Sequence, residues 1–413
     1  MDPFATSSRR RFHRQMVAWV PGVLAGAADA DPTTVAAIAV VGASTVYGLS
    51  WLVLLVFPLL AVVQVIASQV GLVSGRDLQT NAVRAFAPSA RVALLISVVV
   101  VNVVTVTADL EGGAAAIGVL TGAPWRWFVL PLALLVVALL VFGAYRSVQK
   151  FLLGALAFLF AYVVSAVLAH VDWGEVARAT LHPSLRMNSD WTGGAIAILG
   201  TTLTGYVYIW LTIEEAEERS PLSLRRAKAT GAWVGILFSV VLFWFILVAS
   251  GATLGVHHQH IKTVEDAAAA LRPLAGSLAS DIFAVGLLAS AVVALPVIAS
   301  TSAYVLAAQN GWTRGLTLPV RQAGRFYGAL VGGVALGTGL AFIGVSPIRL
   351  LYIASVAGGL ATPVGLVALL ALAGNAQIMN GHCIGRRLRL AGWCVVAVLT
   401  AVSGVYLVQL VLG

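Results

Sequence analysis

The chain has few charged residues for its length. Asp, Glu, Lys and Arg make up 10% of its 413 residues, whereas soluble domains carry about 25%. Hydrophobic residues account for 60%, and the mean hydropathy is +0.96. This composition indicates an integral membrane protein whose surroundings are a lipid bilayer. The net charge of +9 does not predict a nucleic-acid partner, because Lys and Arg lie in short segments between apolar runs.

Cysteine is also scarce, with only Cys383 and Cys394 in the whole chain. Their spacing is not a ligand spacing such as Cys-x-x-Cys, so we expect reduced structural residues. The sequence has no Walker loop, Gly-x-Ser-x-Gly elbow, His-Glu-x-x-His pair or dinucleotide fingerprint. We therefore expect that the chain is not an enzyme or an ATP-driven pump. We also expect no cofactor and no obligate protein partner.

Apolar windows of about 20 residues predict eleven transmembrane helices in an all-α fold. The predicted spans are 17–46, 47–70, 91–119, 125–145, 148–171, 191–213, 229–254, 279–308, 325–344, 346–374 and 389–412. Most of the 25 Lys and Arg residues lie in every second connecting segment. By the positive-inside rule this places the basic tail, residues 1–16, in the cytoplasm and the C-terminus outside. We expect a multi-pass protein of the inner (plasma) membrane.

The first predicted span is interrupted by Asp29, Asp31 and Pro32. A carboxylate near the bilayer midplane is costly, so it normally faces a cavity, a partner or an ion. Pro32 should break the helix, which frees the backbone groups that membrane ion sites use. Asp31 is therefore the strongest candidate ligand, although Asp is also a good helix N-cap. For Asp29, a place in the site or in a vestibule stays open.

The sixth span has a middle that is rich in glycine and threonine. Gly200 and Gly205 bracket Thr201, Thr202 and Thr204. These residues either serve close helix packing or mark a second break.

The matching positions of the two interrupted spans predict an inverted repeat. Spans one and six each begin a set of five helices, which is the pattern of transporters with a site at the midplane. The repeats would cover residues 17–171 and 191–374. Residues 389–412 would form one extra helix.

Several stretches resemble the Nramp family of divalent-metal transporters, in the order in which that family has them. They are residues 21–26 (PGVLAG) followed by Asp31-Pro32, 71–78 (GLVSGRDL), 195–200 (AIAILG), 268–274 (AAALRPL) and 347–351 (PIRLL). The resemblance implies eleven or twelve helices, the leucine-transporter type of inverted repeat with interrupted helices 1 and 6, and cation uptake into the cytoplasm.

The chain departs from the family in its first-helix motif. The family's Asp-Pro-Gly-Asn reads Asp31-Pro32-Thr33-Thr34 here. The carboxylate is kept, and the amide becomes a hydroxyl.

The sixth and tenth helices depart from the family as well. The family's Ala, Met and His read Thr201, Thr204 and Tyr206, and a Gln of its tenth helix reads Ser355. These changes are similar to the branch of Nramp-related magnesium transporters. Thioether and imidazole suit softer transition metals, whereas oxygen ligands and retained waters suit Mg²⁺; Mn²⁺ is hard enough to compete.

The candidate metal ligands are therefore Asp31, Thr34, Thr201, Thr204 and Asp29. For the threonines, ordinary back-bonding within a helix is an equal alternative. Secondary candidates along the ion pathway are Tyr206, Asp109, Glu111 and Ser355.

The two acids of this secondary set lie in the third predicted span. Asp109 matches an acidic position of the family's third helix, whereas Glu111 falls one place short of the next. Acids inside a membrane span are functional by default, and a structural ion pair is the alternative.

We expect a secondary transporter that takes up divalent cations, with Mg²⁺ favoured and Mn²⁺ tolerated. Because the family's His is absent, we expect no proton coupling. An organic-solute carrier of the amino-acid type on the same fold is the alternative, and a non-transporting sensor is a third. The charged run 214–219 (EEAEER), after the sixth span, is interpreted as a solvated helix end, with a gate latch as the alternative.

Overall fold

The computed structural model describes residues 30–142, 156–169, 171–186, 188–217 and 222–412, and the statements below apply to them. Their regular structure is helical, without a β-strand, which confirms the all-α fold class. The helices are α2 (Pro32–Thr45), α3 (Ser50–Ser74), α4 (Leu78–Ala85), α5 (Pro88–Thr121), α6 (Arg126–Val141), α8 (Ala161–Leu168), α9 (Trp173–Leu181), α10 (Ser189–Thr202), α11 (Gly205–Glu217), α12 (Leu222–Ser250), α13 (Val264–Ala268), α14 (Arg272–Ala275), α15 (Ala279–Asn310), α16 (Gly324–Leu340), α17 (Pro347–Ala373) and α18 (Arg386–Leu412).

Each of the eleven predicted spans contains helix in the described part of the chain. Seven helical segments are long and apolar enough to cross a membrane, and the bent pair α8–α9 would add an eighth. The first span, 17–46, is described only by its second half, α2, and the fifth only from residue 156. The prediction of a multi-pass membrane protein is confirmed.

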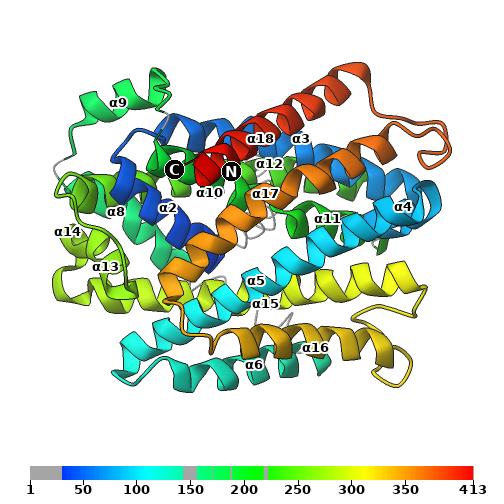
Figure 1. Ribbon diagram of the computed structural model, residues 1–413, viewed down its shortest axis with the longest axis horizontal. Helices are drawn as coiled ribbons and strands as arrows, with labels where there is room; N and C mark the ends of the chain where they lie inside the picture. Colours follow the sequence, from blue (N-terminus) through cyan, green and yellow to red (C-terminus); the bar gives the residue numbers. More distant parts are fainter. Residues whose placement is uncertain (1–29, 143–155, 170, 187, 218–221, 413) are drawn as a thin grey trace, which may run out of the picture.

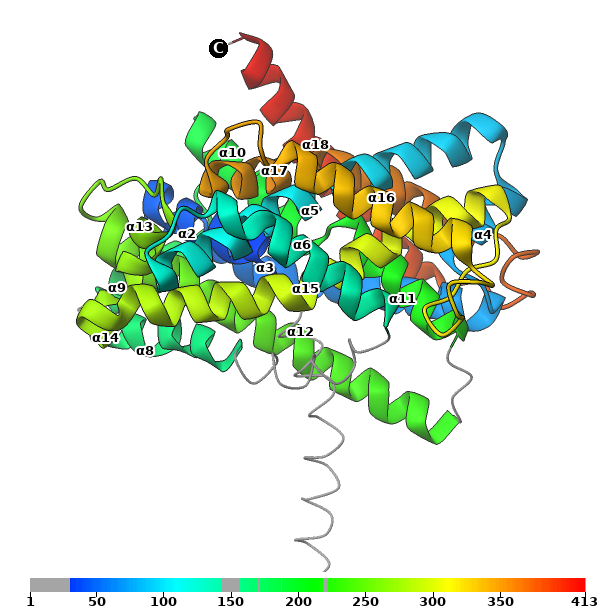
Figure 2. The ribbon, with the colours of Figure 1, turned by 90° about the horizontal axis from the view of Figure 1, so that it is seen from below.

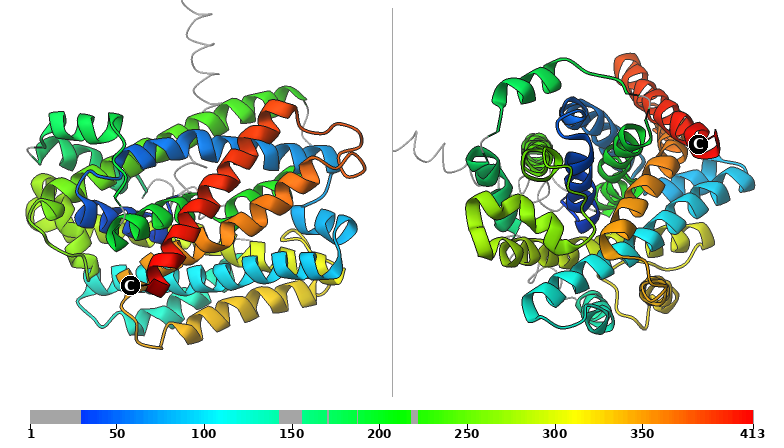
Figure 3. Two further views of the ribbon diagram at one scale, coloured as in Figure 1. Left: turned by 45° about the horizontal axis from the view of Figure 1, so that its top comes forward. Right: turned by 60° about the vertical axis from the view of Figure 1, so that its left-hand side comes forward.

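The helices form one bundle with α2 in its interior. The long helices α5, α15, α16 and α6 lie side by side, as Figure 1 shows. The right-hand view of Figure 3 shows α2 (blue) surrounded by the other helices, and most of its residues are buried. The last turns of α18 project beyond the bundle (Figure 2) and are exposed, so α18 adds a peripheral helix.

Helix α2 begins inside the protein rather than at a surface. Asp31 is its N-cap, and its side chain accepts a hydrogen bond from the backbone N–H of Thr34. Pro32 follows at the first helical position, where its missing N–H costs nothing. The sequence therefore starts a helix at residue 32; the part of the predicted first span before residue 30 lies outside the described residues.

The sixth span is broken, as predicted, between its Gly- and Thr-rich residues. Helix α10 ends at Thr202, Leu203 and Thr204 are non-helical, and α11 begins at Gly205. Neither half alone is long enough to cross a membrane, but together, as Ser189–Glu217, they are long and apolar enough. The break faces α17, since Thr362 donates a hydrogen bond to the carbonyl oxygen of Leu203 (3.3 Å).

Helices α10 and α17 cross with their backbones almost in contact. A Cβ atom on Gly200 would lie 2.1 Å from the carbonyl oxygen of Ser355 and 2.2 Å from the nitrogen of Gly359. A Cβ atom on Gly359 would lie 2.6 Å from the carbonyl oxygen of Ile196. Only glycine fits at this crossing, because most of the atoms that a side chain would meet are backbone atoms, which cannot turn aside. The close packing fixes the position of α10 against α17 near Thr202, where α10 ends.

Changing Gly200 to Ala tests this crossing. Since the new methyl group must push two backbones apart, G200A should lower the free energy of unfolding by about 1–3 kcal/mol or more. Thermal unfolding of the purified chain in detergent measures the change. The matched control is G332A on α16, where a Cβ atom meets nothing within 4 Å. Equal unfolding temperatures for G200A and G332A would contradict the crossing.

Candidate functional site

The start of α2 places the Asp31 carboxylate against the second half of the broken sixth span. One oxygen, Oδ1, accepts the N–H of Thr34 at 2.6 Å. The other, Oδ2, accepts the hydroxyl of Tyr206 on α11 at 2.8 Å. Asp31 is only 1% exposed. The N-cap role and a place at the meeting point of the interrupted helices therefore coexist in one residue.

A hydroxyl pair joins the two interrupted spans directly. The side-chain oxygens of Thr34 on α2 and Thr201 on α10 are 2.7 Å apart. Both residues are buried. The two predicted ligands thus share a hydrogen bond although they are 167 positions apart in the sequence. For both threonines, the side chain bonds to another helix and not merely to its own backbone.

A second carboxylate reaches the same helix start from α5. Asp109 Oδ1 accepts two hydrogen bonds from Thr33, one from its hydroxyl at 2.6 Å and one from its N–H at 3.2 Å. Asp109 is fully buried, and its charge interacts repulsively with that of Asp31. Its other oxygen, Oδ2, has no hydrogen-bond partner among the described residues.

Hydroxyl side chains also cover backbone carbonyls around the start of α2. Ser290 on α15 donates to the carbonyl oxygen of Ala30. Ser355 on α17 donates to those of Thr33 (3.4 Å) and Leu351 (3.0 Å). Because no water reaches the core of a bilayer, such carbonyls must be satisfied by the protein.

The remaining predicted residues lie nearby or outside the described chain. Thr204 lies in the break itself and is buried, beside Gly358 of α17. Asp29 lies outside the described residues. Glu111 is buried on α5, and its Oε2 has no hydrogen-bond partner in the described part of the chain. The positive charge of Arg126 acts on Glu111, but the two residues form no ion pair in the described chain. The alternative of a structural ion pair is therefore not seen for Glu111.

Sequence reasoning missed Thr33 and Ser290, and it ranked Tyr206 too low. A signal existed for Thr33, which stands where the family motif has Gly, so a new side chain enters the motif. For Ser290 the signal is weak, since it is one serine in a long apolar helix. The tyrosine was treated as a lost histidine, whereas its hydroxyl bonds to Asp31.

The donor set consists of oxygen atoms. The two carboxylates of Asp31 and Asp109 lie among hydroxyls of Thr33, Thr34 and Thr201. No group of three His, Cys, Asp or Glu side chains that could enclose a metal occurs in the ranges that the structure describes. Oxygen donors without imidazole or thiolate suit a hard cation that keeps part of its water shell.

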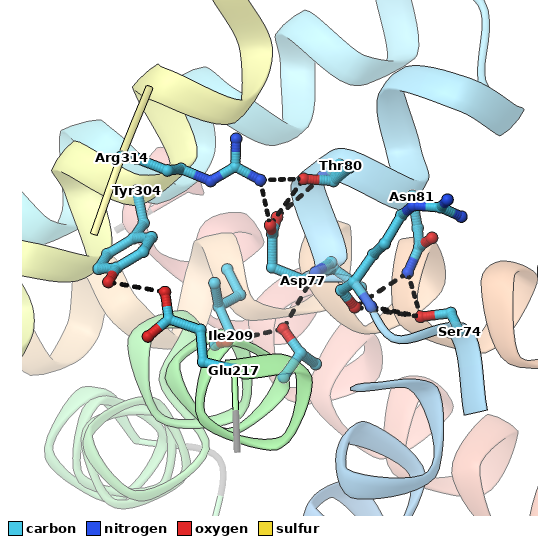
Figure 4. A network of polar contacts seen from close by, with 11 residues as sticks. Ser74, Asp77, Thr80, Asn81, Ile209, Glu217, Tyr304 and Arg314 are labelled. Atoms are coloured by element: carbon cyan, nitrogen blue, oxygen red, sulfur yellow. Dashed lines mark hydrogen bonds and ion pairs between the residues drawn. The ribbon is translucent and has the colours of Figure 1, made fainter. Parts of the chain in front are cut away.

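A second polar network lies at the ends of α3, α11 and α15 and at the start of α4, and Figure 4 shows part of it from close by. Arg314 forms an ion pair with Asp77 (2.7 Å), the N-cap of α4. Tyr304 on α15 donates to Glu217 at the end of α11 (2.9 Å). Glu215 accepts a hydrogen bond from Ser68 on α3 (3.0 Å). Glu217 is exposed, as expected of a solvated helix end, whereas Glu215 is half-buried; residues 218–219 lie outside the described chain.

Comparison with known sequences gives one family over nearly the whole chain. The model of the family described as natural resistance-associated macrophage protein-like (Nramp) matches residues 22–409. The divalent metal cation transporter MntH of Ralstonia nicotianae is 28% identical over 411 residues, which cover 95% of this chain and 90% of that protein. The MntH of Deinococcus radiodurans is 26% identical over 407 residues, with 95% and 90% covered. These relatives are named as transporters, in agreement with the expectation of a non-enzyme.

Solved structures support the fold. The manganese transporter of Eremococcus coleocola superimposes with a TM-score of 0.70 at 20% identity, covering 95% of this chain and 86% of that one. Mhp1, a nucleobase-cation-symport-1 family transporter, gives a TM-score of 0.54 at 15% identity, covering 92% and 90%. The predicted leucine-transporter type of fold is confirmed.

A double-mutant cycle tests the hydroxyl pair between α2 and α10. T34V and T201V should each destabilise the protein, and together they should show a coupling of about 0.5–1.5 kcal/mol, because both remove the same hydrogen bond. The free energy of unfolding is measured in detergent for the two single variants and the double variant. As a control, T34V is combined with T338V, whose hydroxyl bonds only to Val334 within α16. Additive effects in both cycles would show that Thr34 and Thr201 do not interact.

Proposed function

Since the chain belongs to the Nramp family, we propose that it is a secondary transporter that carries divalent metal cations across the membrane. The observation that carries the proposal is the position of Asp31. Its carboxylate lies at the buried start of α2 and bonds to Tyr206 just after the break of the sixth span. The names of the MntH relatives and of the manganese transporter support a divalent cation as cargo.

We further propose that Mg²⁺ is favoured and Mn²⁺ tolerated. The described site offers carboxylate and hydroxyl oxygens, and Thr204 stands where the family has a thioether. Mg²⁺ keeps several waters and binds through one or two carboxylates. Manganese remains a competitor because it accepts the same hard ligands.

The proposed mechanism is alternating access around a fixed site. One bundle of helices rocks against the rest, and the ion binds between the interrupted first and sixth spans. The two repeats would cover residues 17–171 and 191–374, with 389–412 as an added helix. The chain would lie in the inner (plasma) membrane with its N-terminus in the cytoplasm and its C-terminus outside.

Transport is proposed to proceed without proton coupling. Tyr206 stands at the family's His position and donates its hydroxyl to Asp31. A phenol does not exchange its proton near neutral pH, since its reference pKa is about 10. The membrane potential and the cation gradient would then drive uptake.

Replacing Asp31 tests the site. D31A should abolish uptake of Mn²⁺ and Mg²⁺ into proteoliposomes, because it removes the carboxylate that faces both interrupted spans. The control is E265Q, which changes an exposed carboxyl group on α13 and should leave uptake near normal. Competition between Mg²⁺, Mn²⁺ and Ca²⁺ ranks the cargo, and an amino-acid panel tests the organic-solute alternative. Normal uptake by D31A would remove Asp31 from the site.

Proton coupling is tested with a pH dye inside the liposomes. Cation uptake should leave the internal pH unchanged, since the residue at the family's histidine position is Tyr206, and a phenol has a reference pKa of about 10. Acidification that rises in step with Mn²⁺ or Mg²⁺ entry would contradict uncoupled transport. A proton ionophore that collapses any pH signal without changing cation flux separates leak from coupling.

A further inference from the structure

The first turn of α2 is bonded to two carboxylates at once. Asp31 Oδ1 accepts the N–H of Thr34, and Asp109 Oδ1 accepts the N–H of Thr33. These are adjacent N–H groups, so a carboxylate of α5 lies beside the N-cap carboxylate. The helix dipole stabilises negative charge at this end, but the two acids repel one another.

Asp109 is incompletely satisfied in this position. Its Oδ2 atom is buried and has no donor in the described chain. Neither Asp31 nor Asp109 forms an ion pair with a basic residue of the described ranges. A buried carboxylate that lacks a cationic partner is costly, and a cation between the two acids would remove the cost.

We propose that Asp109 is a second anionic ligand of the transported dication, and that Thr33 is the residue that positions it. The proposal rests on the proposed function. Thr33 holds Oδ1 through both its hydroxyl and its N–H, which leaves Oδ2 as the oxygen available to the ion. The glycine of the family motif has no hydroxyl with which to hold Asp109 in this way.

Two carboxylates determine the class of cargo. Together they balance the charge of one divalent cation, so the site should discriminate strongly against monovalent cations. Without the charge of Asp109, a single carboxylate would remain among the described groups, and monovalent ions would compete better.

Calorimetry with MnCl₂ and MgCl₂ measures metal binding to the full chain in detergent and so tests the assignment. D109N can still accept both bonds from Thr33 through its amide oxygen, but it lacks the charge, so affinity should fall at least about 10-fold. D109E should recover part of the loss. Excess NaCl should weaken Mn²⁺ binding by a larger factor in D109N than in the unaltered chain.

Thr33 is tested by a matched set of hydroxyl variants. T33V should weaken Mn²⁺ binding about 10-fold, whereas T33S should stay close to the unaltered chain, because serine keeps the hydroxyl. The control is T107V on α5, whose hydroxyl bonds to Val103 within the helix and lies beside Gly337 of α16. Unfolding temperatures without metal report folding for every variant.

The outcomes separate this assignment from the proposed function. Mn²⁺ binding by the unaltered chain that is lost in D31A but unchanged in D109N would overturn the role of Asp109 alone. Equal losses in T33V and T107V would overturn the positioning role of Thr33. If D109N altered only proton movement, Asp109 would be a proton carrier and not a ligand. If the unaltered chain bound neither metal, the proposed function and this assignment would both be wrong.

Discussion

A helix that starts or stops inside a bilayer leaves backbone groups that no water can satisfy, and the described site is organised by this constraint. At the start of α2, the N–H groups of Thr33 and Thr34 are accepted by two carboxylates. The nearby carbonyls of Ala30 and Leu203 are covered by hydroxyls from α15 and α17. The same interruption that exposes polar backbone therefore gathers side chains from four different helices around one point.

That gathering also explains the chemistry of the site. The groups that satisfy an interrupted helix in an apolar surrounding are oxygen atoms, and oxygen atoms are the ligands of hard cations. Tyr206 keeps Asp31 oriented through a neutral hydroxyl, so the carboxylate is held without a competing positive charge. In the family resemblance, a thioether and an imidazole stand at the positions of Thr204 and Tyr206, and the proposal of a hard cation rests on their absence here.

The sequence predicted the features that depend on local rules. Helix α2 begins at Asp31-Pro32, and the Gly- and Thr-rich stretch breaks the sixth span, as short-range propensity predicts. Contacts between distant residues were out of reach. Thr33 and Asp109 are 76 positions apart, and Ser290 and Ala30 are 260 apart. No periodicity specifies which serine of α15 faces a carbonyl of the first span. The hydrogen bonds at the end of α11 were out of reach for the same reason, because the partners Ser68 and Tyr304 come from α3 and α15.

The crossing of α10 and α17 at Gly200 and Gly359 has a mechanical consequence. Backbones that touch without intervening side chains have no flexible layer that could absorb sliding. The two helices can tilt about this contact, but they cannot slide past each other. Any rearrangement that moves Thr201 must therefore carry Ser355 with it, so the hydroxyl that covers the Thr33 carbonyl travels in step with the one that bonds Thr34.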